Sequence, residues 1–274
     1  MAWSTFRSLL VVCGVLASVE AGEPWGYSEK SDQYFPPSRW SEVNSDCGGT
    51  HQSPINLAYN GPDVINRWNS THGVVPIKFV GDCRNFNLRT LDDLFKWEFS
   101  GDHSCKVKLQ LEGGKTYTLA QYHIHSRSEH TICGHHYSGE VHFVHKEDGG
   151  SGLLVTGLLL HADVNAAESA WVEDVWRTMN EGKEGEVIPV TMKINYVDFL
   201  NAIVRKSHLF NYKGSLTTPP CSEIVNWWVI NNPLSISVSE LDRLLERYRE
   251  RPTAADGFNN RPTQPLNDRK VIHY

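Results

Sequence analysis

Short apolar runs rich in branched and aromatic residues recur along the chain, and this pattern restricts its fold more than any other feature. Alternation and β-branched content predict strands at 74–80, 85–91, 95–99, 105–111, 117–125, 140–146, 153–161 and 224–230. Glycine pairs at 113–114 and 149–150 separate consecutive runs, as hairpin connections require. Only 165–179, with an Asn cap, and 237–248, with a Ser cap, have clear helical periodicity. The pattern predicts a mainly β protein with peripheral helices.

Residues 22–274 are predicted to form one domain, because no repeat, linker or low-complexity tract divides them. Of the 274 residues, 40% are hydrophobic and 21% are charged, which is enough to build a large core. The net charge is -6 and Lys and Arg form no long run, so nothing electrostatic points to nucleic acid or an anionic membrane as a partner.

The N-terminus has the order of a secretory signal over residues 1–21. Arg7 is followed by an apolar run at 9–19 and then by small residues, with cleavage expected near Ala21. A membrane anchor is the alternative, but the run is shorter than the roughly 20 apolar residues of a spanning helix. The C-terminal tail has no hydrophobic end of the GPI type. We therefore expect a secreted, extracellular protein without a membrane anchor.

The cysteines agree with an oxidising compartment. Removal of the signal takes Cys13 away and leaves an odd number at wide, irregular spacing: Cys47, Cys83, Cys105, Cys133 and Cys221. This spacing argues against a thiolate zinc site and for disulfides, with one thiol left over. Asn69 begins an Asn-Ser-Thr glycosylation sequon, which is usable only on the secretory route.

Two of the predicted strands carry histidines with matching parity. In a strand, Gln121, His123 and His125 point to one face, and Glu140 and His142 share a face of the second strand. If the strands are neighbours, three imidazoles converge. Three neutral nitrogen ligands with a fourth position open to water are typical of a catalytic zinc site. Gln121 could orient His123, and Glu140 could orient His142.

These residues also fit two other interpretations. A lone His-x-His in a strand is more often structural or exposed, so the metal site depends on the second strand, and His72, His103, His135, His136 and His273 are expected to be surface histidines. His123, His125 and Glu129 also resemble the first half of a cupin metal motif. The second half needs a Pro-x-Gly turn before its histidine, and no proline precedes His142 there.

Further segments extend the pattern along the chain. They are Trp25-Gly26-Tyr27, Trp40, Gln52-Ser53-Pro54-Ile55-Asn56, Ser128-Glu129-His130, Val155-Thr156-Gly157-Leu158, Gly214-Ser215-Leu216-Thr217-Thr218-Pro219-Pro220-Cys221 and Asn259-Asn260-Arg261-Pro262-Thr263-Gln264-Pro265. Together with the two histidine strands and in this order, they resemble the α carbonic anhydrases over nearly the whole mature chain.

The resemblance implies a large twisted, mostly antiparallel sheet with peripheral helices, and Zn²⁺ on His123, His125 and His142. It places Asn259 beside Gln121 and Glu140 among the residues that orient these ligands. Thr217 would donate a hydrogen bond to Glu129 and accept one from a zinc-bound hydroxide, so both are implied catalytic residues. The implied substrate-binding residues are Thr217, Thr218, Val144, Val155, Leu216, Val225 and Trp227.

The implied activity is reversible hydration of carbon dioxide to bicarbonate by attack of the hydroxide, with sulfonamides and anions as inhibitors. A catalytically silent binding or matrix protein is the alternative, as in family members that lack a zinc histidine. This chain keeps all three histidines, Glu129 and Thr217.

Two details concern positions matched to the family. Arg84 stands where fast members have a histidine proton shuttle, and arginine cannot release a proton near neutral pH. Cys47 and Cys221 match a pair joined in secreted members. The remaining Cys83, Cys105 and Cys133 cannot all pair within one chain, so one stays free in a monomer or links two chains in a dimer.

Overall fold

The computed structural model describes residues 24–67, 75–102, 104–111 and 113–274. The predicted signal with Cys13, the sequon at Asn69, and His72 and His103 lie outside these residues. No helix among the described residues combines the length and apolar character needed to cross a bilayer.

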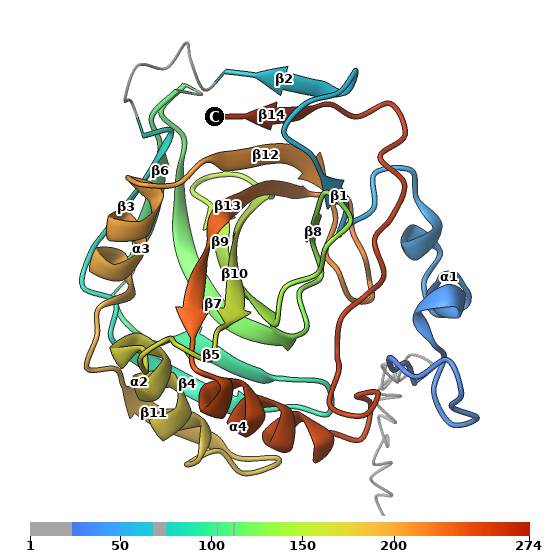
Figure 1. Ribbon diagram of the computed structural model, residues 1–274, viewed down its shortest axis with the longest axis vertical. Coiled ribbons are helices and arrows are strands. Elements are labelled where there is room, and N and C mark those ends of the chain that lie inside the picture. Colours follow the sequence, from blue (N-terminus) through green and yellow to red (C-terminus); the bar gives the residue numbers. More distant parts are fainter. Residues whose placement is uncertain (1–23, 68–74, 103, 112) are drawn as a thin grey trace, which may run out of the picture.

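One twisted sheet, with twelve strands in the described residues, forms the body of the molecule (Figure 1). Its path is β11 (Val187–Thr191), β4 (Asn85–Thr90), β5 (Phe95–Phe99), β7 (Thr116–Ser126), β9 (Gly139–Glu147), β10 (Leu153–Ala162), β13 (Val225–Ile236), β12 (Leu209–Gly214), β14 (Val271–His273) and β2 (Val64–Asn66). Off this path, β3 (Ile77–Val80) pairs with β6 (Lys106–Leu109), which pairs with β7. A separate pair joins β1 (Asn56–Leu57) to β8 (Thr131–Ile132).

Most neighbouring strands are antiparallel, whereas β10–β13 and β14–β2 are parallel. Every run predicted as a strand overlaps one, and both glycine pairs lie in antiparallel hairpins, β6–β7 and β9–β10. The predicted mainly β class is confirmed. The sequence did not reveal β12, because most of its residues are buried on both faces and it lacks alternation.

Helices lie around the sheet. Figure 1 shows α2 (Ala170–Met179), α3 (Tyr196–Val204) and α4 (Val238–Arg249) on its outside and the short α1 (Trp40–Val43) on the opposite side. Short 3-10 turns, η1 (Pro37–Arg39) and η2 (Ser45–Gly48), flank α1. Helix α4 begins as predicted, since Ser237 and Glu240 form a capping box.

One helix prediction needs correction, and one helix was not predicted. Helix α2 begins after Ser169 rather than near Asn165, because Asn165 donates its backbone N–H to Asp163 Oδ1 in a preceding turn. The unpredicted helix is α3. Asn195 caps this helix by accepting from the backbone N–H of Val197, but the segment is short and apolar on most sides, so its periodicity is weak.

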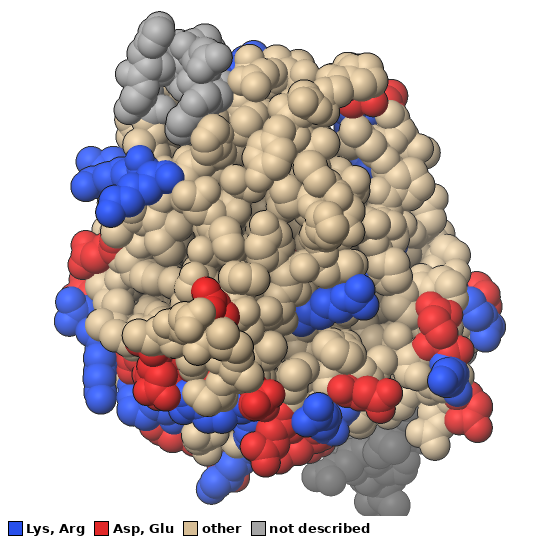
Figure 2. Space-filling view, viewed as in Figure 1, with Lys and Arg blue, Asp and Glu red and all other residues tan. Residues whose placement is uncertain are grey.

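Two apolar clusters lie on the two faces of the sheet. The larger one packs beneath α2, α3 and α4 and includes Trp97, Tyr122 and Trp228. The smaller one includes Val144, Val155 and Trp227 and lies on the face that bears the histidines. On the molecular face in Figure 2, acidic and basic residues interleave and gather toward the end that carries α2 and α4.

Two disulfides join the described cysteines. Cys47 pairs with Cys221, as the family resemblance implied, and Cys83 pairs with Cys105. Cys133 is exposed and unpaired, so it is the thiol left over. The structure thus decides a pairing that the sequence had left open.

Candidate metal centre

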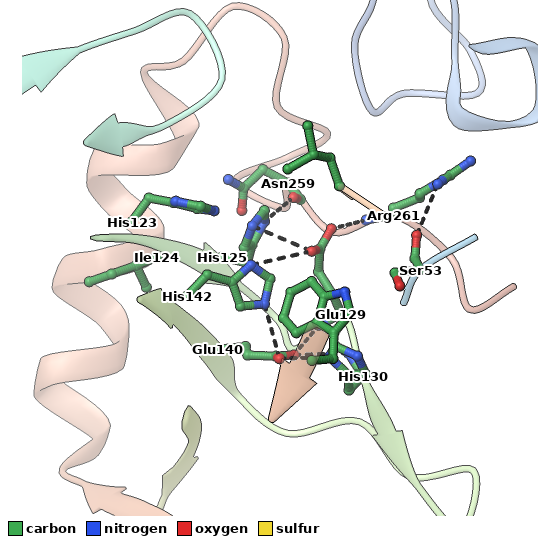
Figure 3. Close-up of polar contacts among 12 residues, drawn as sticks. Ser53, His123, Ile124, His125, Glu129, His130, Glu140, His142, Asn259 and Arg261 are labelled. Atoms are coloured by element: carbon green, nitrogen blue, oxygen red, sulfur yellow. Dashed lines mark hydrogen bonds and ion pairs between the residues drawn. The ribbon is translucent and has the colours of Figure 1, made fainter. Parts of the chain in front are cut away.

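The three histidines meet because β7 and β9 are antiparallel neighbours in one register. His123 lies directly opposite His142, and His125 lies opposite Glu140. Alternation then places all three imidazoles on the same face of the sheet. One ligand atom from each ring falls within 4.8 Å of the others, and Figure 3 shows the rings turned toward a common point.

Each imidazole is fixed by a hydrogen bond on its outer nitrogen. His123 Nδ1 lies 2.8 Å from Gln121 Oε1, and His125 Nδ1 lies 2.8 Å from the backbone oxygen of Asn259. His142 Nε2 lies 3.0 Å from Glu140 Oε1. Because these acceptors take the ring N–H, the lone pairs on Nε2 of His123, Nε2 of His125 and Nδ1 of His142 face inward.

The donor set fits a zinc ion. Burial is the main cause that lowers the pKa of all three imidazoles, and it lowers that of His125 to about 4, so the rings are neutral near pH 7. His125 Nε2 is buried and has no hydrogen-bond partner among the described residues. Three neutral nitrogens with an unpartnered inward lone pair suit a divalent zinc ion with one position open.

Glu129 lies beside the three rings and is completely buried. Its Oε1 accepts from the backbone N–H of Arg261 at 2.8 Å, and its Oε2 lies 3.4 Å from His125 Nε2 and 3.8 Å from His142 Nδ1 (Figure 3). Burial raises the pKa of Glu129 to about 7, while His142 and hydrogen bonds from Thr217 and Arg261 oppose the rise. The carboxylate is therefore held within reach of the Thr217 hydroxyl.

Thr217 sits in a tightly connected loop that follows β12. Trp227 Nε1 donates to the oxygen of Ser215 at 3.0 Å, and the backbone N–H of Cys221 donates to the oxygen of Thr218 at 2.8 Å. The disulfide from Cys221 to Cys47 fastens the end of the loop. Thr217 is buried and Thr218 is half-buried.

The apolar residues matched to the substrate wall lie in one row next to the histidines. Val144 pairs with Val155, and Val155 pairs with Trp227 across β9, β10 and β13. Val225 and the half-buried Leu216 belong to the same cluster. Gly157, opposite His142, leaves space that a Cβ would take, since that atom would lie 2.6 Å from Glu140 Oε1.

His130 holds one of the residues that orient the ligands, a role not predicted from the sequence. Its Nδ1 lies 2.7 Å from Glu140 Oε1, and its Nε2 lies 2.7 Å from the Tyr212 hydroxyl, which donates to Ser53 Oγ at 2.9 Å. Glu140 Oε2 also accepts from the backbone N–H groups of Glu129 and His130. Burial opposes ionisation, but His130 and His142 hold the pKa of Glu140 well below its usual range.

The other predicted positions are placed as follows. Arg84 precedes β4, is 46% exposed and pairs with Asp82 at 3.0 Å. His135 is exposed and His136 is half-buried, with its Nδ1 2.8 Å from the oxygen of Ser128. The expectation of a surface His273 is wrong, because β14 inserts between β12 and β2 and buries the ring against His208, 2.9 Å away.

Comparisons with known proteins agree on one family. Residues 36–274 match the model of the eukaryotic-type carbonic anhydrases. A carbonic anhydrase of Nostoc is 35% identical over 90% of this chain and 85% of its own length. Alpha carbonic anhydrase 3 of Arabidopsis thaliana is 30% identical over 88% of this chain and 82% of its own length.

Solved structures share the fold. The α carbonic anhydrase of Thermovibrio ammonificans, in complex with the inhibitor sulfanilamide, is 31% identical and superposes with a TM-score of 0.71 over 92% of this chain and 99% of its own. A carbonic anhydrase of Chlamydomonas reinhardtii, in complex with acetazolamide, is 26% identical with a TM-score of 0.69 over 91% of this chain and 98% of its own.

Proposed function

We propose, from the premise that this chain belongs to the eukaryotic-type carbonic anhydrase family, that it is an active zinc enzyme that interconverts carbon dioxide and bicarbonate. One observation carries the proposal. Three neutral imidazole nitrogens converge within 4.8 Å beside the buried Glu129, whose Oε2 lies 3.4 Å from His125 Nε2. Family membership also leaves the cupin interpretation without support.

His123, His125 and His142 would hold the zinc through their inward nitrogens. When bound, zinc lowers the pKa of a water ligand to roughly 7, the established value for carbonic anhydrases, and so supplies a hydroxide nucleophile near neutral pH. Gln121, Glu140 and the oxygen of Asn259 keep the three rings in the tautomers that present these nitrogens.

Thr217 and Glu129 would orient the nucleophile. A hydroxyl has one proton and two acceptor sites. Because Glu129 takes that proton, the Thr217 oxygen can only accept a hydrogen bond from the nucleophile, which aims a lone pair at the substrate. Glu129 keeps its place through the backbone N–H of Arg261.

The apolar row beside the histidines would receive carbon dioxide. Val144, Val155 and Trp227 offer no charge and line the same face as the nitrogens. Leu216 and Val225 extend this wall, and Thr218 borders it. An uncharged substrate without a strong hydrogen-bonding group suits such a surface, and charged bicarbonate does not.

Stopped-flow hydration of carbon dioxide, run together with zinc analysis, tests this function. We expect about one zinc per chain and rapid hydration, both lost in His142→Ala. Zinc binding without hydration would favour the silent binding or matrix protein instead. Sulfanilamide and acetazolamide, bound by structural neighbours, should inhibit hydration.

We also propose that the mature protein is a secreted monomer comprising residues 22–274. The disulfides Cys47–Cys221 and Cys83–Cys105 support an oxidising compartment. The exposed Cys133 keeps a disulfide-linked dimer open as the alternative. N-terminal sequencing and non-reducing electrophoresis of the secreted protein test these points, and loss of mass on deglycosylation would identify Asn69 as modified.

A further inference from the structure

Charged side chains stand on the strands beside the metal centre. Lys96 of β5 lies directly opposite the ligand His123, and Glu98 lies opposite Gln121. Arg89 of β4 is in turn the partner of Lys96. We call Lys96, Glu98 and Arg89 the charged trio.

The trio shares the face of the sheet that bears the histidines. Directly paired residues project to the same side of a sheet. Lys96 therefore projects to the same face as His123, and Glu98 projects to the same face as Gln121. The intervening Trp97 points the other way, since it is buried and stacks on Tyr122 with ring centroids 4.9 Å apart. Lys96 therefore projects beside a metal ligand.

Contacts within the trio hold two cations around one anion. Lys96 Nζ lies 3.1 Å from Glu98 Oε1, and Arg89 Nε lies 2.6 Å from Glu98 Oε2. Their side chains are 27% (Lys96), 32% (Glu98) and 44% (Arg89) exposed. The trio thus carries one net positive charge, and its least exposed cation is the one next to His123.

Charges of the opposite sign also lie beside the ligands. The carboxylates of Glu129 and Glu140 also face the ligands, with their charge engaged by backbone N–H groups and, for Glu140, by His130. The charged trio, on the β5 side of the ligands, carries a net positive charge.

We propose that the charged trio sets the affinity of the metal centre for anions, with Lys96 strengthening and Glu98 weakening the binding of bicarbonate and inorganic anions. The inference rests on the proposed zinc function. A fixed positive charge near a partly enclosed site raises the local concentration of anions and stabilises them when bound. It has little effect on carbon dioxide, which is uncharged.

Competition with dansylamide tests the proposal by binding rather than by turnover. The zinc-loaded full chain is titrated with this fluorescent sulfonamide, which is then displaced by bicarbonate or thiocyanate at constant ionic strength. We expect Lys96→Gln to raise the Kd of both anions about threefold to tenfold, as a partly screened unit charge at close range does. Lys96→Arg should stay within about twofold of wild type.

Glu98→Gln tests whether removing a negative charge strengthens anion binding. It removes the anion and leaves the two cations, so we expect the anion Kd to fall by a similar factor. A merely structural role for the trio would instead weaken anion binding in both variants, and that result would overturn the proposal.

Lys106 is the matched control. It is 33% exposed and pairs with Asp148 at 2.8 Å, much as Lys96 pairs with Glu98, but it lies opposite Thr118, about 16 Å along β7 from His123. Lys106→Gln should leave the anion Kd unchanged.

Dansylamide binding with equal anion affinities in wild type and Lys96→Gln overturns this inference alone. Zinc-loaded wild type that fails to bind dansylamide overturns the proposed zinc function as well.

Discussion

His125 Nδ1 lies 2.8 Å from the backbone oxygen of Asn259, a residue 134 positions further along the chain. The carbonyl takes the ring N–H, so the Nε2 lone pair of His125 must face the other two imidazoles. A loop near the C-terminus therefore decides which nitrogen of a central strand can bind metal. The backbone supplies this contact, so no side chain at 259 is needed for it.

Removal of this imidazole should abolish the centre. We expect His125→Ala to lose most of its zinc and to hydrate carbon dioxide at the background rate, because two nitrogens hold zinc far less well than three. Zinc analysis and stopped flow measure both effects. His135→Ala, which changes an exposed ring, should behave as wild type. Near-normal hydration by His125→Ala would refute the assigned site.

Stability should fall in mild acid partly through His145, a buried ring outside the ligand set. Its Nε2 lies 3.0 Å from the Tyr196 hydroxyl, and burial lowers its pKa from 6.5 to about 4. The unfolded chain therefore binds one more proton between these pH values. The stability that the neutral ring contributes is complete above pH 6.5 and is lost as pH falls toward 4, at up to about 1.4 kcal/mol per pH unit.

Urea unfolding of the zinc-free chain at pH 7 and pH 5 measures this effect. His145→Gln should lose less stability between the two pH values than wild type, by about 1 to 2 kcal/mol. His161→Gln, at an exposed ring, serves as the control. Equal losses in wild type and His145→Gln would contradict the prediction.

The Cys47–Cys221 disulfide should stabilise both the fold and the Thr217 loop. It joins residues 174 positions apart and ends beside that loop. We expect the paired change of Cys47→Ser and Cys221→Ser to cost about 2 to 5 kcal/mol of unfolding free energy and to weaken sulfonamide binding. Cys133→Ser should change neither property. Peptide mapping without reduction that finds another partner for Cys221 would overturn the assignment.

Proton release should limit turnover, because Arg84 stands at the position matched to the histidine proton shuttle of fast family members. Its guanidinium stays protonated and pairs with Asp82 at 3.0 Å, so it cannot relay protons. A water with a pKa near 7 releases its proton to bulk water at only about 10³ to 10⁴ per second, given a diffusion-limited return. We expect kcat well below the roughly 10⁶ per second of carbonic anhydrases with a shuttle, whereas kcat/KM should change less.

Imidazole buffer should raise kcat. Arg84→His should raise it at low buffer concentration if the new side chain points into the cavity and a chain of waters joins it to the zinc. Stopped flow across a buffer series measures both. A wild-type kcat near 10⁶ per second at low buffer would show that another group relays the protons.

Local pattern predicted much of this protein. Alternation over 117–125 and 140–146 fixed which histidines share a face, and a strand geometry with a period of two leaves no freedom in that choice. The same alternation linked Gln121 to His123 and Glu140 to His142, because these pairs are two residues apart. Turn glycines and the Ser237 cap marked hairpins and a helix for equally local reasons.

Tertiary structure decided whatever depends on distant partners. Local pattern cannot show that β7 and β9 are neighbours with His123 opposite His142, that Cys83 meets Cys105, or that β14 buries His273. The position of Lys96 beside the ligand His123 also depends on a distant partner, because the two residues meet only through the β5–β7 register. The sequence alone determined the faces of its strands, because side-chain direction is set within each strand. Their neighbours were decided only when the whole sheet assembled, because pairing depends on packing between segments far apart in the chain.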